Sequence, residues 1–168
     1  ADELIVGDDK TKITRLIKAN IHNYAVIVVC GGTSLGIRDY TAKAIKDLSP
    51  KVFIHGIALQ PGRTTVLSTI RGRLVVGISG LPVAAYANLE LVISDILEKW
   101  LNTEPPLKPK VKAILMKRVT TKSGMRALVR VRLHLSKEGY IAEPLLVGGS
   151  GSLRSLLLSN GYLIVPED

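Results

Sequence analysis

The first apolar residues of the chain recur at the spacing of an α-helix. Between residues 7 and 21, one helical face collects four large aliphatic side chains, Ile13, Leu16, Ile17 and Ile21. Asp8 and Asp9 precede this face, where a carboxylate can accept hydrogen bonds from the free amides of a first helical turn. We therefore predict a helix that starts near Asp9 and ends near Ile21.

A short unbroken run of apolar residues follows this helix. Residues 24–30, with the sequence YAVIVVC, predict a strand covered on both faces in a parallel sheet, because such strands lack the alternation of a half-exposed strand. Helical spacing returns at 40–48, and the Ser-Pro pair that follows ends it. The remaining predicted elements are a strand at 51–59, a hairpin of 65–70 with 73–79, and a helix from Pro82 to about Leu101.

Residues 102–110 separate this region from one with another period. The three prolines in their sequence, NTEPPLKPK, predict a linker. In residues 125–135 basic or polar side chains alternate with apolar ones, which predicts a half-buried strand of a β-meander, and a glycine loop, a helical turn and a last strand follow. The chain is therefore predicted to divide into an α/β domain at 1–102, a linker at 103–110 and a small β-domain at 111–168.

Three loops of the α/β domain each follow a predicted strand. They comprise residues 31–39, 60–64 and 77–82, and each contains small or turn-forming residues. In a parallel α/β sheet the carboxyl ends of the strands share one edge, and ligands bind in the crevice at that edge. We therefore expect the three loops to meet around one ligand.

The first of these loops has the chemistry of an anion site. Gly31, Gly32 and Gly36 allow backbone amides to face outward and to approach a ligand closely, and Thr33 and Ser34 add hydroxyl donors. The spacing matches neither the GxGxxG of dinucleotide-binding folds nor a phosphate loop that ends in Gly-Lys-Ser. The loop is therefore predicted to bind an anion without a nucleotide fingerprint.

Two charged residues of the loops each have two interpretations. Asp39 has the wrong sign for the anion itself, so it suits a hard cation such as Mg²⁺, but an N-cap of the following helix accounts for it as well. Arg63 follows Pro61 and Gly62, a turn that would aim its guanidinium at a phosphate, although an exposed turn arginine has the same pattern. The glycines of the third loop either offer amides at a helix start or pack tightly on the sheet.

Charge and composition narrow the classes of partner. The formal net charge is +9, and the segment from Lys108 to Arg132 holds nine basic residues and no acidic one, which suits a solvated basic surface or an anionic partner. That segment has no aromatic residue on which a base could stack, so nucleic-acid binding is the weaker interpretation.

No stretch is long and apolar enough to span a membrane and the amino terminus has no signal-like core, so we expect a cytoplasmic protein. Cys30, at the end of an apolar run, is expected to be buried and inert.

Four segments, in order, resemble the motifs of one enzyme family, the molybdopterin molybdotransferases of the MoeA and gephyrin E-domain type. Residues 31–41, GGTSLGIRDYT, resemble GGxSxGxxDYT; residues 55–64, HGIALQPGRT, resemble HGVAMxPGKP; and residues 77–86, GISGLPVAAY, resemble GLPGNPVSA. Residues 149–168 resemble the C-terminal β-barrel segment of that family. The resemblance implies an α/β three-layer sandwich of the molybdopterin-binding, MogA-like type, followed by a small β-barrel-like domain.

Enzymes of that family insert molybdate into adenylylated molybdopterin with Mg²⁺ and release AMP. The resemblance implies that Asp39 is the catalytic and metal-binding residue, and that Arg63 replaces the lysine of PGKP. The residues that it implies for binding molybdopterin and its phosphate are Gly31, Gly32, Thr33, Ser34, Gly36, Pro61, Gly62, Arg63, Ser79 and Gly80. The implied partners are adenylylated molybdopterin, molybdate or tungstate, and a second copy of the chain in a homodimer.

Departures from the family pattern leave other functions open. Ser79 stands where the family has proline, Leu81 where it has asparagine, and Thr64 replaces the proline that ends PGKP. A molybdopterin adenylyltransferase, whose loop resembles GGTGxxxRDxT, and a non-catalytic pterin-binding or scaffold protein therefore remain alternatives. The resemblance also implies that two N-terminal domains, the first strand of the α/β domain and a closing barrel strand are missing, so the chain is expected to be inactive alone.

Overall fold

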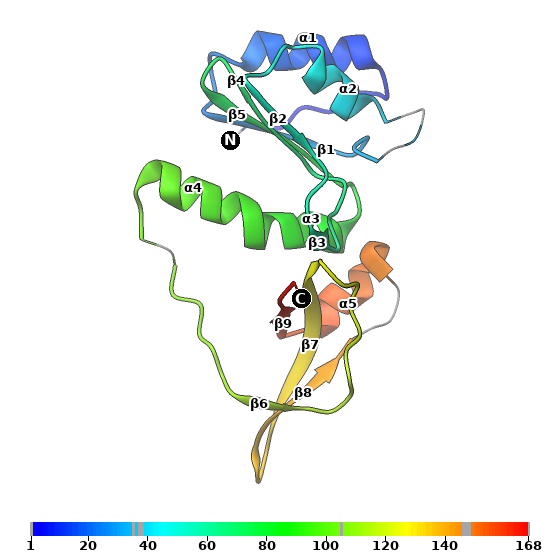
Figure 1. Cartoon of the computed structure of the whole chain (residues 1–168), viewed down its shortest axis with the longest axis vertical. Coiled ribbons are helices and arrows are strands. Elements are labelled where there is room, and N and C mark those ends of the chain that lie inside the picture. Colours follow the sequence, from blue (N-terminus) through cyan, green and yellow to red (C-terminus); the bar gives the residue numbers. More distant parts are fainter. Residues whose placement is uncertain (1, 35, 37–38, 105, 146–148, 168) are drawn as a thin grey trace. The chain divides into compact units, whose positions relative to one another are not determined.

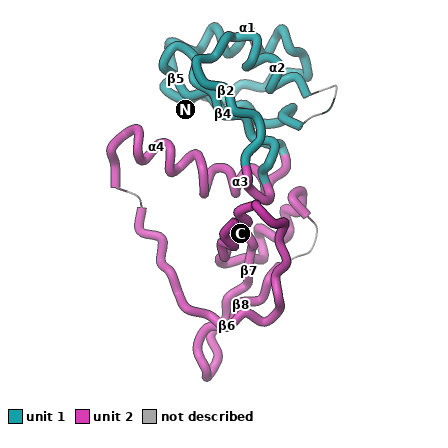
Figure 2. The backbone as a smooth tube through the Cα atoms, viewed as in Figure 1, with its two compact units in different colours: residues 1–57, 62–80 teal, residues 58–61, 81–168 magenta. Residues whose placement is uncertain are grey.

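The computed structural model of the chain describes residues 2–34, 36, 39–104, 106–145 and 149–167. The chain folds into two compact units, one of residues 1–57 and 62–80 and one of residues 58–61 and 81–168 (Figure 2). Each unit contains a β-sheet of its own.

The first unit is a mixed four-stranded sheet with two helices on one face (Figure 1). The strand order is β1-β5-β4-β2, with β1 parallel to β5 and the other pairs antiparallel. The predicted α/β class is therefore confirmed, but the sheet is not purely parallel. Its elements are α1 (Lys10–Asn20), β1 (Val26–Cys30), α2 (Tyr40–Lys46), β2 (Val52–His55), β4 (Val66–Ile70) and β5 (Arg73–Ile78).

The core of this unit lies between the helices and the sheet. The side chain of Asp9 caps α1 by accepting a hydrogen bond of 2.9 Å from the amide of Lys12, so the predicted start of the helix is confirmed. The apolar face of α1 packs against α2 and the sheet, and the buried core residues are Ile13, Ile17, Ile21, Ala42, Ala44, Ile45, Val66, Ile70 and Val75. Each large aliphatic side chain among them stabilises the fold by about 1.5–3 kcal/mol relative to an exposed one.

The hairpin predicted at 65–79 is confirmed as β4 and β5. Two residues connect the strands, Arg71 with φ +50° and Gly72 with φ +75°. Two successive positive φ angles give a turn whose twist matches that of the two strands, and glycine adopts such an angle without steric cost.

The prediction that strand 24–30 is covered on both faces is wrong. Val28 in β1 is 41% exposed, and Cys30 at its end is also exposed rather than buried. Since both helices of the unit pack on one face, only Ile27 and Val29 of β1 reach the core. An unbroken apolar run therefore lies here on an edge strand of the sheet.

The second unit begins with one long helical segment. It consists of α3 (Pro82–Asn88), the π-helical turn η1 (Leu89–Ile93) and α4 (Ser94–Leu101), so the helix predicted from Pro82 to about Leu101 is confirmed. Pro82 stands in the first turn, where no amide hydrogen is needed. Asn102 ends the segment in the left-handed conformation, which is common after a helix.

The remainder of the second unit is a five-stranded sheet built around one long strand. That strand, β7 (Arg126–Ser136), pairs with β3, β8 and β9, and β6 pairs with β8. The other strands are β3 (Leu59–Gln60), β6 (Ala113–Leu115), β8 (Gly139–Pro144) and β9 (Gly161–Val165), and the short helices are η2 (Gly149–Gly151) and α5 (Leu153–Leu158). The single strand predicted at 51–59 is thus two strands in different sheets, separated at Gly56, whose φ is +96°.

A polar network connects three segments of the second unit. The Nζ atom of Lys108 lies 2.8 Å from Glu90 Oε1, and the hydroxyl of Tyr162 donates to the same oxygen at 2.5 Å. Burial and the hydrogen bond to Glu90 raise the pKa of the Tyr162 phenol, which therefore stays protonated as the donor. The network ties the linker and the last strand to the π-helical turn.

Among the helices that the structure describes, none is long and apolar enough to cross a membrane.

Candidate functional site

The described parts of the three predicted loops that belong to the first unit lie at one edge of its sheet. Because β2 and β5 are each antiparallel to β4, while β1 is parallel to β5, the strands β1, β2 and β5 all run in the same direction. One row of paired residues crosses their carboxyl ends, in the order Val29, Gly77, Val66 and His55. The segments that follow β1, β2 and β5 therefore leave the sheet at the same edge.

The glycine loop (residues 31–34 and 36) begins with two residues that need to be glycine. Gly31 and Gly32 have φ angles of +95° and +62°, and a Cβ on Gly32 would stand 2.9 Å from Thr41 Oγ1. The amide of Gly31 donates to the carbonyl of Ile78 at 2.8 Å, and Thr41 Oγ1 donates to the carbonyl of Gly31 at 2.7 Å. Hydrogen bonds thus connect the start of the loop to β5 and to α2.

Thr33 is the point at which the glycine loop meets the other elements. Its side chain is 2% exposed, and its hydroxyl lies 3.4 Å from that of Thr64. Its carbonyl oxygen lies 3.0 Å from Nε2 of His55, at the end of β2. Gly77 leaves the space that Thr33 occupies, since a Cβ there would stand 3.0 Å from Thr33 Cγ2. Ser34, the next residue of the predicted set, is exposed.

Asp39 stands at the N-cap position of α2 but does not cap that helix with its side chain. Its Oδ2 atom instead accepts a hydrogen bond of 2.6 Å from the amide of Gly36, and its own amide donates to the Gly36 carbonyl at 3.2 Å. The amide of Gly36 thereby orients the carboxylate. Part of the predicted anion loop, residues 35, 37 and 38, lies outside the described residues.

The Arg63 turn (residues 62–65) is held by hydrogen bonds to its backbone carbonyl groups. The carbonyl of Arg63 accepts from the amide of Ile57 at 2.9 Å, and Thr65 Oγ1 donates to the carbonyl of Gly62 at 2.8 Å. Gly62, with φ +118°, is buried, whereas Arg63 is exposed. Pro61 precedes the turn after a cis peptide bond, and its side chain is half-buried. A fixed backbone therefore carries an exposed guanidinium.

The third loop approaches the first at Gly80. A Cβ added at Gly80 would lie 3.6 Å from the Cα atom of Gly31, so the two loops are neighbours. Ser79 is half-buried and Gly80 is exposed. Leu81, where the family motif has asparagine, is the N-cap residue of α3 and is 48% exposed. The substitution at this position therefore removes a side chain that could cap the helix.

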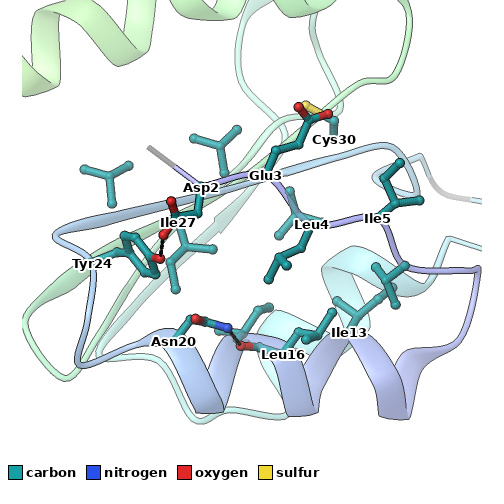
Figure 3. A pocket seen from close by; sticks show the side chains of 15 residues that line it. Asp2, Glu3, Leu4, Ile5, Ile13, Leu16, Asn20, Tyr24, Ile27 and Cys30 are labelled. Atoms are coloured by element: carbon teal, nitrogen blue, oxygen red, sulfur yellow. Dashed lines mark hydrogen bonds between the residues drawn. The ribbon is translucent and has the colours of Figure 1, made fainter.

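A separate groove of about 480 Å³ runs along β1 (Figure 3). The N-terminal segment 2–6 forms one wall, β1 another, and the apolar face of α1 the floor. Figure 3 shows Leu4 of that segment above Leu16 of α1. The hydroxyl of Tyr24 donates to Asp2 at one end, and Cys30 lies at the other. Partial burial raises the pKa of the Cys30 thiol. The groove is lined mainly by aliphatic side chains, which do not suit an anion.

In the part of the chain that the structure describes, acidic, histidine and cysteine side chains do not gather into a metal cage. Among the described residues, no group of three or more is placed to hold a metal ion. A cation at Asp39 would therefore take most of its ligands from elsewhere, which is the usual situation of Mg²⁺ bound to substrate phosphates and water.

Two residues that contact Thr33, namely His55 and Thr64, were not among the predicted site residues. No role in the site was predicted for His55 beyond its place in the segment HGIALQPGRT, and Thr64 was interpreted only as a replacement for proline. The available signal was the place of His55 directly before Gly56 and shortly before the Pro-Gly-Arg sequence. Its bond to a carbonyl of the glycine loop depends on tertiary structure.

Comparison with known protein families gives two matches along the chain. Residues 1–99 match the family described as a probable molybdopterin binding domain. Residues 112–168 match the family described as the MoeA C-terminal region, domain IV.

Individual relatives agree with these matches. A Methanocaldococcus jannaschii protein assigned to molybdopterin biosynthesis is 30% identical over 98% of this chain and 38% of its own length. The molybdopterin molybdenumtransferase of Bacillus subtilis is 27% identical over 96% of this chain and 37% of its own length. A crystal structure of the molybdopterin biosynthesis MoeA protein from Pyrococcus horikoshii superimposes with a TM-score of 0.73 and 34% identity, over 95% of this chain and 37% of that one.

The chain thus spans little more than a third of the length of these relatives. The first family match nevertheless covers more than half of the residues of this chain, including the glycine loop, the Arg63 turn and the third loop. The second match covers the C-terminal strands and helices that follow. This chain belongs to the molybdopterin-binding domain family and carries a MoeA-type C-terminal region.

Proposed function

We propose that this chain is part of a molybdopterin molybdotransferase of molybdenum cofactor biosynthesis. In this proposal it binds adenylylated molybdopterin at the carboxyl edge of the first sheet and contributes to the insertion of molybdate or tungstate, with release of AMP. The observation that carries the proposal is the junction at Thr33, where the glycine loop is bonded to the end of β2 and to the Arg63 turn. Family membership and the names of the relatives support the pterin as the ligand.

The backbone of the glycine loop would bind the phosphate of the pterin. Its glycines allow close approach of amide groups, and amides fixed in place bind an anion without reorganisation. Gly31 and Gly80 are neighbours, so Ser79 and Gly80 would extend the same site. Ser34 is exposed and able to donate its hydroxyl, whereas the buried Thr33 would act mainly by holding the loop.

Arg63 would bind the negative charge of the substrate. The guanidinium is permanently charged and its planar donors match a phosphate or an oxyanion, so it can replace the lysine of the family motif. Its backbone is held by the bonds of the Arg63 turn, while its side chain is exposed to a ligand. Gly62 and Pro61 contribute the shape of that turn.

Asp39 fits the role of a magnesium ligand. A single carboxylate, already oriented by the amide of Gly36, matches the way in which Mg²⁺ is held by one or two carboxylates together with substrate phosphates. When bound, Mg²⁺ would neutralise charge on the phosphates of the adenylylated pterin. The chain's own contribution to cleavage of the bond between the pterin phosphate and AMP would be to orient the phosphate, with molybdate or water as the attacking group.

The wider properties of the protein follow the same proposal. We propose a cytoplasmic homodimer, with residues 1–102 as the pterin-binding domain, 103–110 as a linker and 111–168 as a barrel-like domain. The family matches at 1–99 and 112–168 support this division. A mass measurement in solution tests the dimer.

A fluorescence titration with molybdopterin tests binding. We compare the unmodified chain with Arg63→Glu and with Lys51→Glu, an exposed residue just before β2, at its opposite end from His55. The expected result is saturable binding that weakens as salt is raised, that Arg63→Glu reduces by at least about tenfold, and that Lys51→Glu leaves unchanged. Equal affinity of both variants, or no binding by any of the three, would contradict a pterin site on these loops.

An activity assay separates the molybdotransferase from the alternatives. In the protein extended to the length of its relatives, with adenylylated molybdopterin as substrate, release of AMP should require molybdate or tungstate together with Mg²⁺, and Asp39→Asn should abolish that release. Formation of the adenylylated pterin from ATP would instead identify an adenylyltransferase. Binding without either reaction, also in the protein extended to the length of its relatives, would identify a pterin-binding scaffold.

A further inference from the structure

We propose that His55 is a positioning residue that orients the glycine loop for the phosphate of the pterin. The inference rests on the proposed function and deepens it, because it assigns a role to the first residue of the segment HGIALQPGRT, which is not among the predicted pterin-binding residues. The imidazole stands at the carboxyl end of β2, and its Nε2 atom lies 3.0 Å from the carbonyl oxygen of Thr33.

The chemistry of this contact defines which group is the donor. A carbonyl oxygen can only accept a hydrogen bond, so Nε2 of His55 carries the hydrogen and donates it. The imidazole ring also lies edge-on to Phe53, with ring centroids 6.3 Å apart and an interplanar angle of 68°. The ring is thus supported by its own strand while its Nε2–H reaches a different segment of the chain.

The contact determines the direction of the next amide group of the loop. In a planar trans peptide the carbonyl oxygen and the following N–H point in opposite directions. Because the Thr33 carbonyl faces His55, the N–H of Ser34 points away from the imidazole. The imidazole therefore controls the orientation of a donor that the proposed site uses.

Two further contacts make Thr33 a suitable point of control. Its hydroxyl lies 3.4 Å from that of Thr64, and its methyl group packs into the space above Gly77. These contacts hold the side chain of Thr33 but leave the rotation of the peptide that follows it undetermined. The bond from His55 acts on that peptide.

Two variants separate a hydrogen-bonding role from a packing role. His55→Gln removes the ring but places an amide N–H the same number of bonds from Cα as Nε2 of histidine. His55→Phe keeps an aromatic ring beside Phe53 but has no donor. A positioning role requires that the glutamine variant resembles the unmodified chain and that the phenylalanine variant does not.

The test combines molybdopterin titration with amide hydrogen exchange in the unmodified chain and both variants. We expect His55→Phe to weaken binding about fivefold, the effect of one hydrogen bond, and His55→Gln to bind within about twofold of the unmodified chain. We also expect faster exchange of the Thr41 amide, which is bonded to the Gly32 carbonyl, in His55→Phe alone. The amides of β5 should exchange equally in all three proteins.

Each other outcome overturns the inference. Equal affinity of the unmodified chain and His55→Phe, while Arg63→Glu loses binding, would reject the role of His55 and keep the proposed function. Equal weakening in both His55 variants, with faster exchange in β5, would assign the histidine to folding instead. If the unmodified chain does not bind, the proposed function fails, and unchanged exchange of the Thr41 amide in His55→Phe then rejects the positioning role as well.

Discussion

Thr33 lies directly over Gly77, so that a Cβ atom at residue 77 would stand 3.0 Å from Thr33 Cγ2. The same atom would be 3.1 Å from Thr41 Cγ2 and 3.3 Å from Val66 Cβ. The absence of a side chain near the carboxyl end of β5 is therefore what allows the glycine loop and α2 to approach the sheet. One residue of a buried strand thus determines the shape of the proposed binding site.

Replacement of Gly77 by alanine should destabilise the chain. The added methyl group meets three neighbours at once, and overpacking of this kind costs about 1–3 kcal/mol of the free energy of unfolding. Chemical denaturation measures the loss. In the matched control, Gly7→Ala, the new methyl group has no neighbour within 4 Å, so a change of less than about 0.5 kcal/mol is expected. Equal stability of the two variants would show that Thr33 and Thr41 can move aside without cost.

Asparagine at position 81 should stabilise the second unit. Leu81 is the N-cap residue of α3, makes no side-chain cap and is half exposed. An asparagine side chain can accept a hydrogen bond from a free amide of the first turn, which stabilises a helix by about 0.5–2 kcal/mol relative to alanine. We expect Leu81→Asn to unfold at a higher denaturant concentration than Leu81→Ala. If the two variants unfold together, the asparagine of the family motif has no capping role in this chain.

The contribution of Glu90 to stability should decline at acidic pH. Burial alone would raise the pKa of this carboxyl group, but the hydrogen bonds from Lys108 and Tyr162 outweigh burial and hold the pKa below its ordinary value of 4.5. A folded-state pKa that is lowered stabilises the fold fully above pH 4.5, and the contribution is lost as the pH falls through the lower folded value.

Unfolding of Glu90→Gln at several pH values measures this contribution. At neutral pH the variant should be less stable than the unmodified chain, and the difference should shrink as the pH falls below 4.5. Glu104→Gln removes a carboxylate from an exposed linker position and should have little effect at any pH. A difference between Glu90→Gln and the unmodified chain that is independent of pH would mean that the charge of Glu90 does not matter.

Cys30 should react slowly with iodoacetamide at neutral pH in spite of its exposed position. The thiol is still partly shielded from water by its surroundings, and this desolvation raises its pKa above the ordinary value of 9.0. Only the thiolate is nucleophilic, so a raised pKa lowers the reactive fraction at neutral pH. The rate should therefore reach half of its maximum at a higher pH in the folded chain than in the chain unfolded in urea. Since the chain has one cysteine, the modified protein is counted directly by mass. Equal pH profiles in the two states would contradict the raised pKa.

Most helices and strands of the first unit, and the helix that begins at Pro82, were predicted from the sequence because their signals are local. The helical period of Ile13, Ile17 and Ile21 and the proline at position 82 act through neighbouring residues of the same segment. The turn at Arg71 and Gly72 likewise needs only glycine's freedom to adopt a positive φ. The carboxyl edge of the sheet as the place where three loops meet followed from the prediction that each loop follows a strand of a parallel sheet.

Contacts between distant segments were decided by the tertiary structure alone. An unbroken apolar run does not reveal whether one or two faces of a strand are covered, so the exposure of Val28 and Cys30 was missed. Nor does a histidine at a strand end reveal which carbonyl it meets, as the bond from His55 to Thr33 required two segments 22 residues apart to pack together. The sequence by itself determined the local elements and the small residues of the loops, because backbone preference and periodicity act over a few residues. Packing determined which of those loops touch, since it depends on the whole sheet.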